Sequence, residues 1–379
     1  MNKIGKNRSS IPLSRPDIVP ADIAAVAGVL RTPFLSIGPK VEQFEKRFAQ
    51  FIGVKHAIAM NSGTSGLHAC MKALGTGPGD EVITTPFSFI ASANSILFTG
   101  ATPRFVDIDA TTLNMDLAHL EEAVTRKTRA ILAVHIFGLP CDMQEVTRVA
   151  RKHRIEVIED ACEAVNASCS GRKAGTFGHA AVFAFYPNKQ MTTGEGGMVV
   201  TNDDRCVQLL RSLRNQGRSA SAASAWLEHE RLGYNYRMDE MSAALGLSQL
   251  RRLQSMLASR QRVADAYTRR LQDLPGVQTL VTPKGMKRSW FVYVIRFADP
   301  EMREAAFKNL TRRGIQCGKY FPPIHLQPFY RERFGYAPGS FPVCESVSRS
   351  TLALPFHNRL SEREVDTVVR ALEEVCGRR

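Results

Sequence analysis

The middle of the chain alternates short apolar runs with amphipathic stretches, and this alternation limits the folds that it can adopt. Seven runs have the length and composition of buried strands, at 55–60, 81–85, 102–108, 129–137, 155–160, 180–186 and 197–201. Helical patterns lie between several of them, at 65–75, 116–125 and 142–153. Together these patterns predict an α/β domain with a seven-stranded, mostly parallel sheet between two layers of helices.

The C-terminal third differs in pattern and predicts a second domain. A helical pattern from about residue 239 to 274 stops at the Leu-Pro-Gly sequence that ends it. The rest contains one strand-like run and two helical patterns, at 290–297, 300–313 and 361–375. We expect a large domain over residues 1–250 and a smaller α/β domain over residues 251–379, entered through a long connecting helix.

Gross composition excludes several classes of protein. The 379 residues are 44% hydrophobic and 23% charged, as in globular proteins with a sizeable core. No apolar run is long enough to span a bilayer, and the basic, polar N-terminus lacks the apolar segment of a secretion signal. We therefore expect a soluble, cytoplasmic protein that does not bind membranes.

The spacing of the cysteines and the net charge limit the classes of ligand that we expect this chain to bind. The eight cysteines form no C-x-x-C pair and no H-E-x-x-H motif is present, so we expect reduced thiols and no metal site. A net charge of +14 is compatible with nucleic acid or with phosphorylated ligands. Basic residues are spread over helical faces such as 251–270 rather than gathered in one arm, so we do not expect nucleic-acid binding.

Residues that follow the strands are the candidates for chemistry, because ligands of such sheets bind at the carboxyl ends of the strands. The sequence NSGTSG (61–66) follows the first strand and leads into a helix, which suits a phosphate at the helix N-terminus. The alternative is an ordinary Ser/Thr cap. Phe87 and Phe89 follow the second strand, where an aromatic ring either stacks on a planar ligand or packs in the core.

Two further strand ends carry charged residues. Glu159 and Asp160 end a buried strand, where an acid either caps the next helix or pairs with a positive group such as a protonated ring nitrogen. Lys189 lies between an apolar run and the glycine cluster 194–197, as a turn residue or as a functional amine that forms Schiff bases. Glycines there allow the backbone to pass close to a bulky ligand.

One ligand accounts for all of these positions. A planar aromatic aldehyde with a phosphate and a ring nitrogen is pyridoxal 5′-phosphate (PLP). The 61–66 loop would hold its phosphate, Phe89 would cover its ring, Asp160 would pair with its pyridinium and Lys189 would bind its aldehyde carbon. A protonated ring nitrogen makes this cofactor an electron sink for a carbanion on the substrate.

Four segments resemble the DegT/DnrJ family of PLP-dependent sugar-nucleotide aminotransferases, namely 34–68, 157–164, 183–203 and 232–250. The resemblance runs from about residue 11 to the C-terminus. It implies the type I aminotransferase fold and a homodimer with active sites at the subunit interface. It also implies an enzyme that alternates between PLP and pyridoxamine 5′-phosphate while it moves an amino group.

The resemblance assigns roles to individual residues. Lys189 matches the Schiff-base lysine, Asp160 the pyridinium partner and Phe89 the ring-stacking position. Gly63 and Thr64 match the phosphate loop.

Other positions match the family less closely or concern a second subunit. Asn235 and Arg237 match a segment that reaches the cofactor phosphate of the neighbouring subunit. Glu163 stands where the family often has Gln or His in contact with the cofactor ring, and Ala184 stands where many members have a phosphate-binding Ser. We therefore expect the phosphate to depend more on Thr64, backbone amides and the neighbouring subunit.

The implied reaction transfers the amine of an amino acid, expected to be L-glutamate, to a keto-sugar linked to a nucleoside diphosphate. The amino sugar would serve polysaccharide, lipopolysaccharide or metabolite synthesis. Tyr320 and His325 in the loop 317–335 are the candidate sugar contacts, and a packed proline-rich loop is the alternative.

Two rival functions stay open at this point. One is a PLP-dependent sugar dehydratase or lyase on the same fold, although relatives that dehydrate sugars replace the lysine with histidine and this chain keeps Lys189. The other is a catalytically inactive regulatory homologue, which the positive charge suggests.

Overall fold

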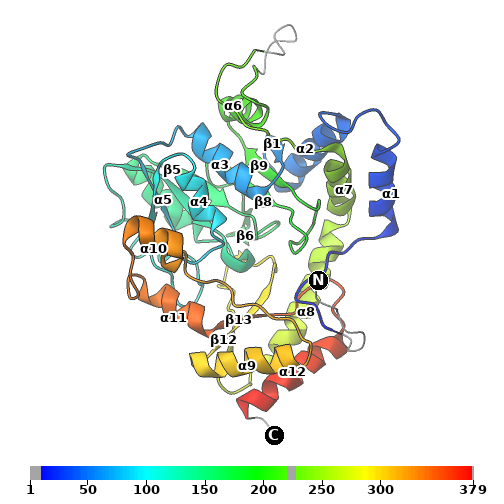
Figure 1. Cartoon of the computed structure of the whole chain (residues 1–379), viewed down its shortest axis with the longest axis vertical. Helices are drawn as coiled ribbons and strands as arrows, with labels where there is room; N and C mark the ends of the chain where they lie inside the picture. The colour runs from blue at the N-terminus through cyan, green and yellow to red at the C-terminus, as the bar shows by residue number, and fades with distance from the viewer. Residues whose placement is uncertain (1–9, 220–227, 378–379) are drawn as a thin grey trace.

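All seven expected strands are present in the computed structural model, which describes residues 10–219 and 228–377 (Figure 1). They are β1 (His56–Met60), β2 (Glu81–Thr84), β3 (Thr102–Phe105), β4 (Thr128–Val134), β5 (Glu156–Asp160), β8 (Ala180–Ala184) and β9 (Gly197–Thr201). They form one sheet in the order β1-β9-β8-β5-β4-β2-β3. Only β9 runs antiparallel to its neighbours β1 and β8, and the other adjacent pairs are parallel.

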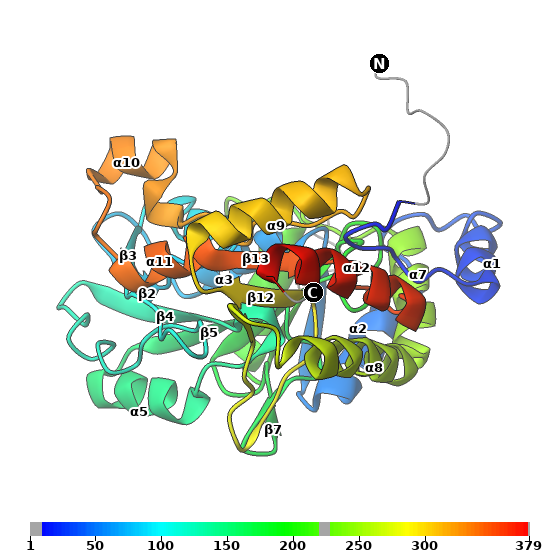
Figure 2. The ribbon, with the colours of Figure 1, turned by 90° about the horizontal axis from the view of Figure 1, so that it is seen from below.

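Alternate residues of the strands belong to two hydrophobic layers, one on each face of the sheet. Ile58 and Val182 face α3 (Gly63–Ala73), α4 (Ala91–Leu97) and α6 (Asp204–Arg214). Their neighbours Ala57 and Ala181 face α2 (Pro39–Ile52) and α7 (Glu240–Arg251) on the opposite side. On that same side α5 (Met143–His153) packs against β4 and β5, as Figure 2 shows. Helices thus cover both faces of the sheet, so we expect a ligand to bind at the ends of its strands.

The helix expected at 116–125 does not form. The N–H groups of His119, Leu120 and Val124 donate to carbonyls three residues back, so this segment is a series of turns. Asp116 accepts hydrogen bonds from the N–H of Ala118 and the ring of His119, which are local bonds that compete with a helix.

The long connector is broken into two helices, α7 and α8 (Leu253–Leu271). Arg252 leaves helical geometry between them, with φ −111° and ψ 10°, and its guanidinium donates to the buried carboxylate of Asp22 at 2.9 Å. Asp22 lies in α1 (Pro20–Val29), far away in sequence, so the pattern of the connector itself gave no sign of this break.

The C-terminal part has its own antiparallel sheet, β10-β12-β13 (Val277–Thr279, Tyr293–Phe297, Thr351–Leu354), covered by α9 (Pro300–Arg312) and α12 (Glu362–Cys376). In Figures 1 and 2 α9 and α12 lie side by side. Residues of α8 and the N-terminal Ile11 belong to the same hydrophobic core. The predicted division at residue 250 stays a prediction.

Short elements complete the described chain: β6 (Ser168–Cys169), β7 (Arg172–Lys173), β11 (Met286–Lys287), η1 (Ile136–Gly138), η2 (Ile324–Leu326), α10 (Pro328–Phe334) and α11 (Pro342–Ser350). The loop expected at 317–335 therefore contains two short helices. Among the helices of the described residues, none is long and apolar enough to cross a membrane.

Candidate active site

Three segments that follow strands converge at one edge of the central sheet. A β-carbon placed on Gly63 would lie 2.8 Å from Cβ of Ala184 and 3.0 Å from Sγ of Cys162. The loop after β1, the end of β8 and the turn after β5 are therefore in contact at this point. The turn that carries Lys189 continues directly from β8.

The loop after β1 caps a helix and also presents backbone N–H groups that suit an anion. Oγ of Ser62 accepts the N–H of Ser65 at 3.1 Å and caps α3. The N–H groups of Gly63 and Thr64 lie in the first helical turn, where no carbonyl of the helix can accept them. These free donors and the positive end of the helix dipole suit a phosphate.

Gly63→Ala is expected to weaken cofactor binding about tenfold or more, because the added methyl group must displace Ala184 or Cys162 at a cost of about 1–3 kcal/mol. Titration of the purified variant with PLP, followed by absorbance, measures the change in Kd. Gly77→Ala is the matched control, since a β-carbon there meets no atom within 4 Å. An unchanged Kd for Gly63→Ala would contradict a tight phosphate loop.

The two acids that end β5 have different surroundings. Glu159 is buried and accepts hydrogen bonds from the His135 ring and from the N–H groups of Gly175, Phe177 and Gly178. Burial alone would raise the pKa of Glu159, but these bonds outweigh it and hold the pKa below its ordinary value. Glu159 therefore has a structural role.

Asp160 is the acid that is available to the site. It is 5% exposed, and its carboxylate accepts a hydrogen bond from Oγ of Ser92 at 2.7 Å and from the N–H of Cys162 at 3.2 Å. These two bonds fix its orientation and leave acceptor capacity for a cationic ligand.

Lys189 has the surroundings of a functional amine rather than of a surface turn. Its side chain is 13% exposed, and Nζ donates to Oε1 of Glu163 at 3.5 Å. Nζ also lies 3.9 Å from the ring centroid of Phe291. The amine is thus largely shielded from water, with one carboxyl group and one aromatic face beside it.

Arg260 is a site residue that the sequence did not reveal. It is 3% exposed and donates to the carbonyls of Lys189 and Phe291, both at 3.0 Å. No carboxylate balances its charge among the hydrogen bonds and ion pairs of the described residues, and burial lowers the pKa of Arg260 to about 10. Arg260 therefore fixes the backbone of Lys189 together with the aromatic residue that faces its amine.

The two phenylalanines after β2 have separate roles. Phe87 is fully buried and packs edge-on against Phe137 and Phe321. Phe89 is 60% exposed, so its ring is available to a ligand. Stacking at Phe89 and core packing at Phe87 are therefore both compatible with the structure.

Of the two candidate sugar contacts, only Tyr320 is partly exposed. It is half-buried and stacks in parallel on Phe321 at 4.9 Å. Burial raises the pKa of Tyr320, and the charges of Glu163 and Tyr186 add to the effect.

For His325 the structure has the alternative that the sequence left open, a packed loop. Its side chain has no exposed area, and Nε2 lies 3.0 Å from Oε1 of Glu345. The ring packs edge-on against Phe341 within an aromatic cluster. His325 is therefore buried within a packed loop, and its role in sugar binding stays a prediction.

The segment of Asn235 and Arg237 runs beside the end of β1. Nδ2 of Asn61 donates to the carbonyl of Asn235 at 3.2 Å, and the N–H of Asn61 donates to the carbonyl of Tyr236. The guanidinium of Arg237 donates to Oδ1 of Asn215 at 3.0 Å.

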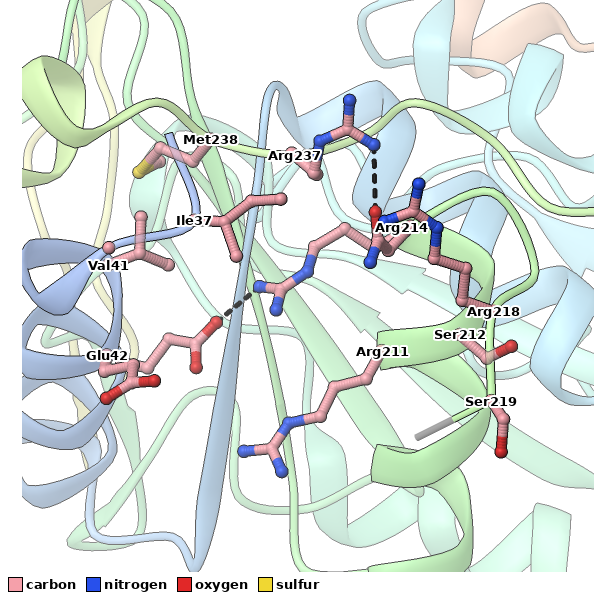
Figure 3. A pocket seen from close by; sticks show the side chains of 13 residues that line it. Ile37, Val41, Glu42, Arg211, Ser212, Arg214, Arg218, Ser219, Arg237 and Met238 are labelled. Carbon is pink, nitrogen blue, oxygen red and sulfur yellow. Dashed lines mark hydrogen bonds and ion pairs between the residues drawn. The ribbon is translucent and has the colours of Figure 1, made fainter. Parts of the chain in front are cut away.

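Arg237 also lines a pocket between α2 and α6, shown in Figure 3. We call this the arginine pocket, and its charged lining residues are Arg211, Arg214, Arg218, Arg237, Glu42 and Glu45. Arg214 is paired with Glu45. Four guanidinium groups against two carboxylates leave a positive pocket, and planar guanidinium groups match phosphate oxygens well.

These features fit PLP and do not indicate a metal. Within residues 10–219 and 228–377, no group of three or more His, Cys, Asp or Glu side chains could hold a metal ion. The free N–H groups at α3 suit a phosphate, the oriented carboxylate of Asp160 suits a pyridinium, and the shielded amine of Lys189 suits an aldehyde.

Comparisons with known proteins agree with this geometry. The model of the DegT/DnrJ/EryC1/StrS aminotransferase family matches residues 16–373. The chain is 42% identical to GDP-perosamine synthase of Caulobacter vibrioides over 90% of this chain and 91% of that protein. It is 39% identical to the spore coat polysaccharide biosynthesis protein SpsC of Bacillus subtilis, over 98% of each.

A solved structure shows the same architecture. DesV of S. venezuelae, in complex with a ketimine intermediate, superimposes with a TM-score of 0.89 at 36% identity. The match covers 94% of this chain and 95% of that one.

Proposed function

Because this chain belongs to the DegT/DnrJ/EryC1/StrS aminotransferase family, we propose which of its residues perform the reaction, which donor it uses and how it assembles. The chain has the type I aminotransferase fold expected from the sequence and is a PLP-dependent sugar aminotransferase that acts on a nucleotide sugar. Our residue assignment rests on the amine of Lys189, which is shielded from water. It lies at the edge of the central sheet where Asp160 ends β5.

The proposed roles follow from the surroundings of each residue. Bound PLP supplies an electron sink that stabilises negative charge on the substrate carbon. Lys189 would hold the cofactor covalently, and its freed amine would move the proton at the substrate carbon as base and then acid. Asp160 would keep the ring nitrogen protonated, and Phe89 would cover one face of the ring. Gly63 and Thr64 would hold the phosphate through their N–H groups.

The substrates follow in part from the relatives. We propose L-glutamate as amino donor and a keto-sugar linked to a nucleoside diphosphate as acceptor. Because one relative is named GDP-perosamine synthase, a keto-sugar linked to guanosine diphosphate is the first acceptor to test. The arginines of the arginine pocket other than Arg237 would supply charge suited to the diphosphate. The name of SpsC supports a product used in a polysaccharide. All eight cysteines are free thiols, which supports the cytoplasm as the compartment.

We propose that the enzyme works as a homodimer with shared active sites. Large apolar side chains of one N-terminal stretch are exposed, as expected of a surface that a second copy covers: Ile23, Leu30, Phe34, Leu35 and Ile37. In this assembly Asn235 and Arg237 of one protomer would contact the cofactor phosphate in the site of the other.

Mixing two inactive variants tests this assembly. Lys189→Ala and Arg237→Ala homodimers are each expected to have little activity. In a hybrid dimer one site receives an intact Lys189 from one chain and an intact Arg237 from the other. Random assembly after co-expression therefore restores about a quarter of wild-type activity, measured as conversion of the keto-sugar nucleotide to its amine by mass spectrometry.

The control is co-expression of Lys189→Ala with Asp160→Asn. Both residues act in the same site of one chain, so no hybrid dimer contains an intact site. If the Lys189→Ala and Arg237→Ala mixture stays as inactive as this control, Arg237 acts within its own chain and the shared site is wrong. The dehydratase or lyase alternative is not favoured by the relatives.

A further inference from the structure

Glu163 is a buried carboxyl group inside the site whose fixed position points to a role beyond packing. Its side chain is 9% exposed. Oε2 accepts the N–H of Phe137 at 2.9 Å, and Oε1 faces Nζ of Lys189 at 3.5 Å. One oxygen is thus anchored to the backbone after β4, and the other is held toward the catalytic amine.

Glu163 shares its surroundings with a small set of titratable groups. Lys189 faces it from the turn after β8, and Asp160 and Cys162 lie close to it in sequence after β5. The guanidinium of Arg260 donates to the carbonyl of Lys189, and the charge of Glu163 acts on Tyr320. Burial raises the pKa of Glu163 and the charge of Asp160 adds to this, while Lys189 and the N–H of Phe137 oppose it. Two acids, one amine and the guanidinium of Arg260 therefore lie in surroundings that are largely shielded from water.

Burial brings the ionic and neutral forms of a Glu–Lys pair closer in free energy than they are in water. The ionic pair gains attraction but loses hydration of both charges, and that loss is large for buried groups. Transfer of one proton from nitrogen to oxygen gives an uncharged amine beside an uncharged carboxylic acid. The direct contact between Oε1 and Nζ provides the path for this transfer.

We propose that Glu163 stores the proton of Lys189, so that the freed amine is neutral when it must act as a base. The N–H bond at Nζ breaks, an O–H bond forms at Oε1, and the net charge of the pair does not change. The proton returns to Nζ when the amine must act as an acid. This inference rests on the proposed role of Lys189.

Proton storage by Glu163 predicts how the reactivity of the Lys189 amine depends on pH. While the pH is below the ordinary lysine pKa of about 10.4, each rise of one pH unit increases the fraction of neutral amine about tenfold. A pair that shares one proton has a constant fraction of neutral amine between its two macroscopic pKa values. The reactivity of Lys189 is therefore expected to be nearly flat around neutral pH.

The test measures amine reactivity without turnover. Full-length protein is loaded with pyridoxamine 5′-phosphate, so that Lys189 is not bonded to the cofactor, and is treated briefly with acetic anhydride at several pH values. Peptide mass spectrometry gives the modification rates of Lys189 and of the exposed Lys284 in the same sample. The variants are Glu163→Gln, which keeps the size but cannot take up a proton, and Glu163→Asp, which keeps the acid.

From about pH 6.5 to about pH 8.5 the rate at Lys284 should rise about 100-fold, as for an ordinary lysine. In the wild-type protein the rate at Lys189 is expected to change less than about threefold. In Glu163→Gln it should rise in parallel with Lys284, and Glu163→Asp should restore a flat profile.

Proton storage would be overturned if the modification rate of wild-type Lys189 rose with pH as that of Lys284 does. It would also be overturned if the rate at Lys189 in Glu163→Gln did not change with pH. The wild-type profile decides the matter even if Glu163→Gln does not fold. Neither result would bear on whether Lys189 binds the cofactor, which the spectrum of Lys189→Ala tests separately.

Discussion

Lys189→Ala is expected to lower the rate of amino transfer by at least about 10⁴-fold, because it removes the covalent anchor and the group that moves the proton. The visible absorbance band that PLP acquires on bonding to a lysine should be absent from the variant. Added PLP is still expected to bind through the N–H groups at α3 and through Asp160.

The matched control is Lys284→Ala, which removes an exposed lysine outside the site and should leave band and rate unchanged. If Lys189→Ala kept the absorbance band, another lysine would hold the cofactor. The assignment of the site to this edge of the sheet would then be wrong.

Asp160→Asn is expected to lower turnover by about 10²–10³-fold, in the range found when a preorganised electrostatic contact is removed. The amide has the shape of the carboxylate and can still accept the N–H of Cys162, but it carries no charge to keep the ring nitrogen protonated. The cofactor should therefore stay bound while the rate of proton removal from the donor falls.

Single-turnover absorbance with L-glutamate measures that step. Asp142→Asn is the control, since Asp142 caps α5 and asparagine is an equally good cap. A rate for Asp160→Asn within about threefold of wild type would exclude Asp160 as the pyridinium partner, because loss of this charge must slow proton removal.

The central sheet could be predicted from the sequence because each strand is a short apolar run between turns. Local patterns were less reliable where distant residues decide the structure. The connector breaks at Arg252 because its guanidinium binds Asp22 of α1, more than two hundred residues away. The segment 116–125 has helical periodicity, yet local hydrogen bonds to Asp116 and turns replace the helix.

The same distinction applies to the site. Asp160 ends β5 and Lys189 follows the neighbouring β8, so their place at one edge of the sheet could be inferred from the position of each in the chain. Ser92 and Arg260 come from helices, and nothing in their sequence shows that they orient Asp160 and Lys189. For His325 the sequence left a sugar contact and a packed loop both open, and it could not decide between them because the partner Glu345 comes from α11.

The most direct test of the account is a stoichiometric half-reaction of the wild-type enzyme. PLP-loaded protein is mixed with L-glutamate in the absence of any sugar, and absorbance and released 2-oxoglutarate are measured together. We expect the visible band to disappear and about one 2-oxoglutarate to be released per active site, with the amine retained on the protein as pyridoxamine 5′-phosphate. A band that persists with L-glutamate and with every other amino acid tested would contradict amino transfer by this chain.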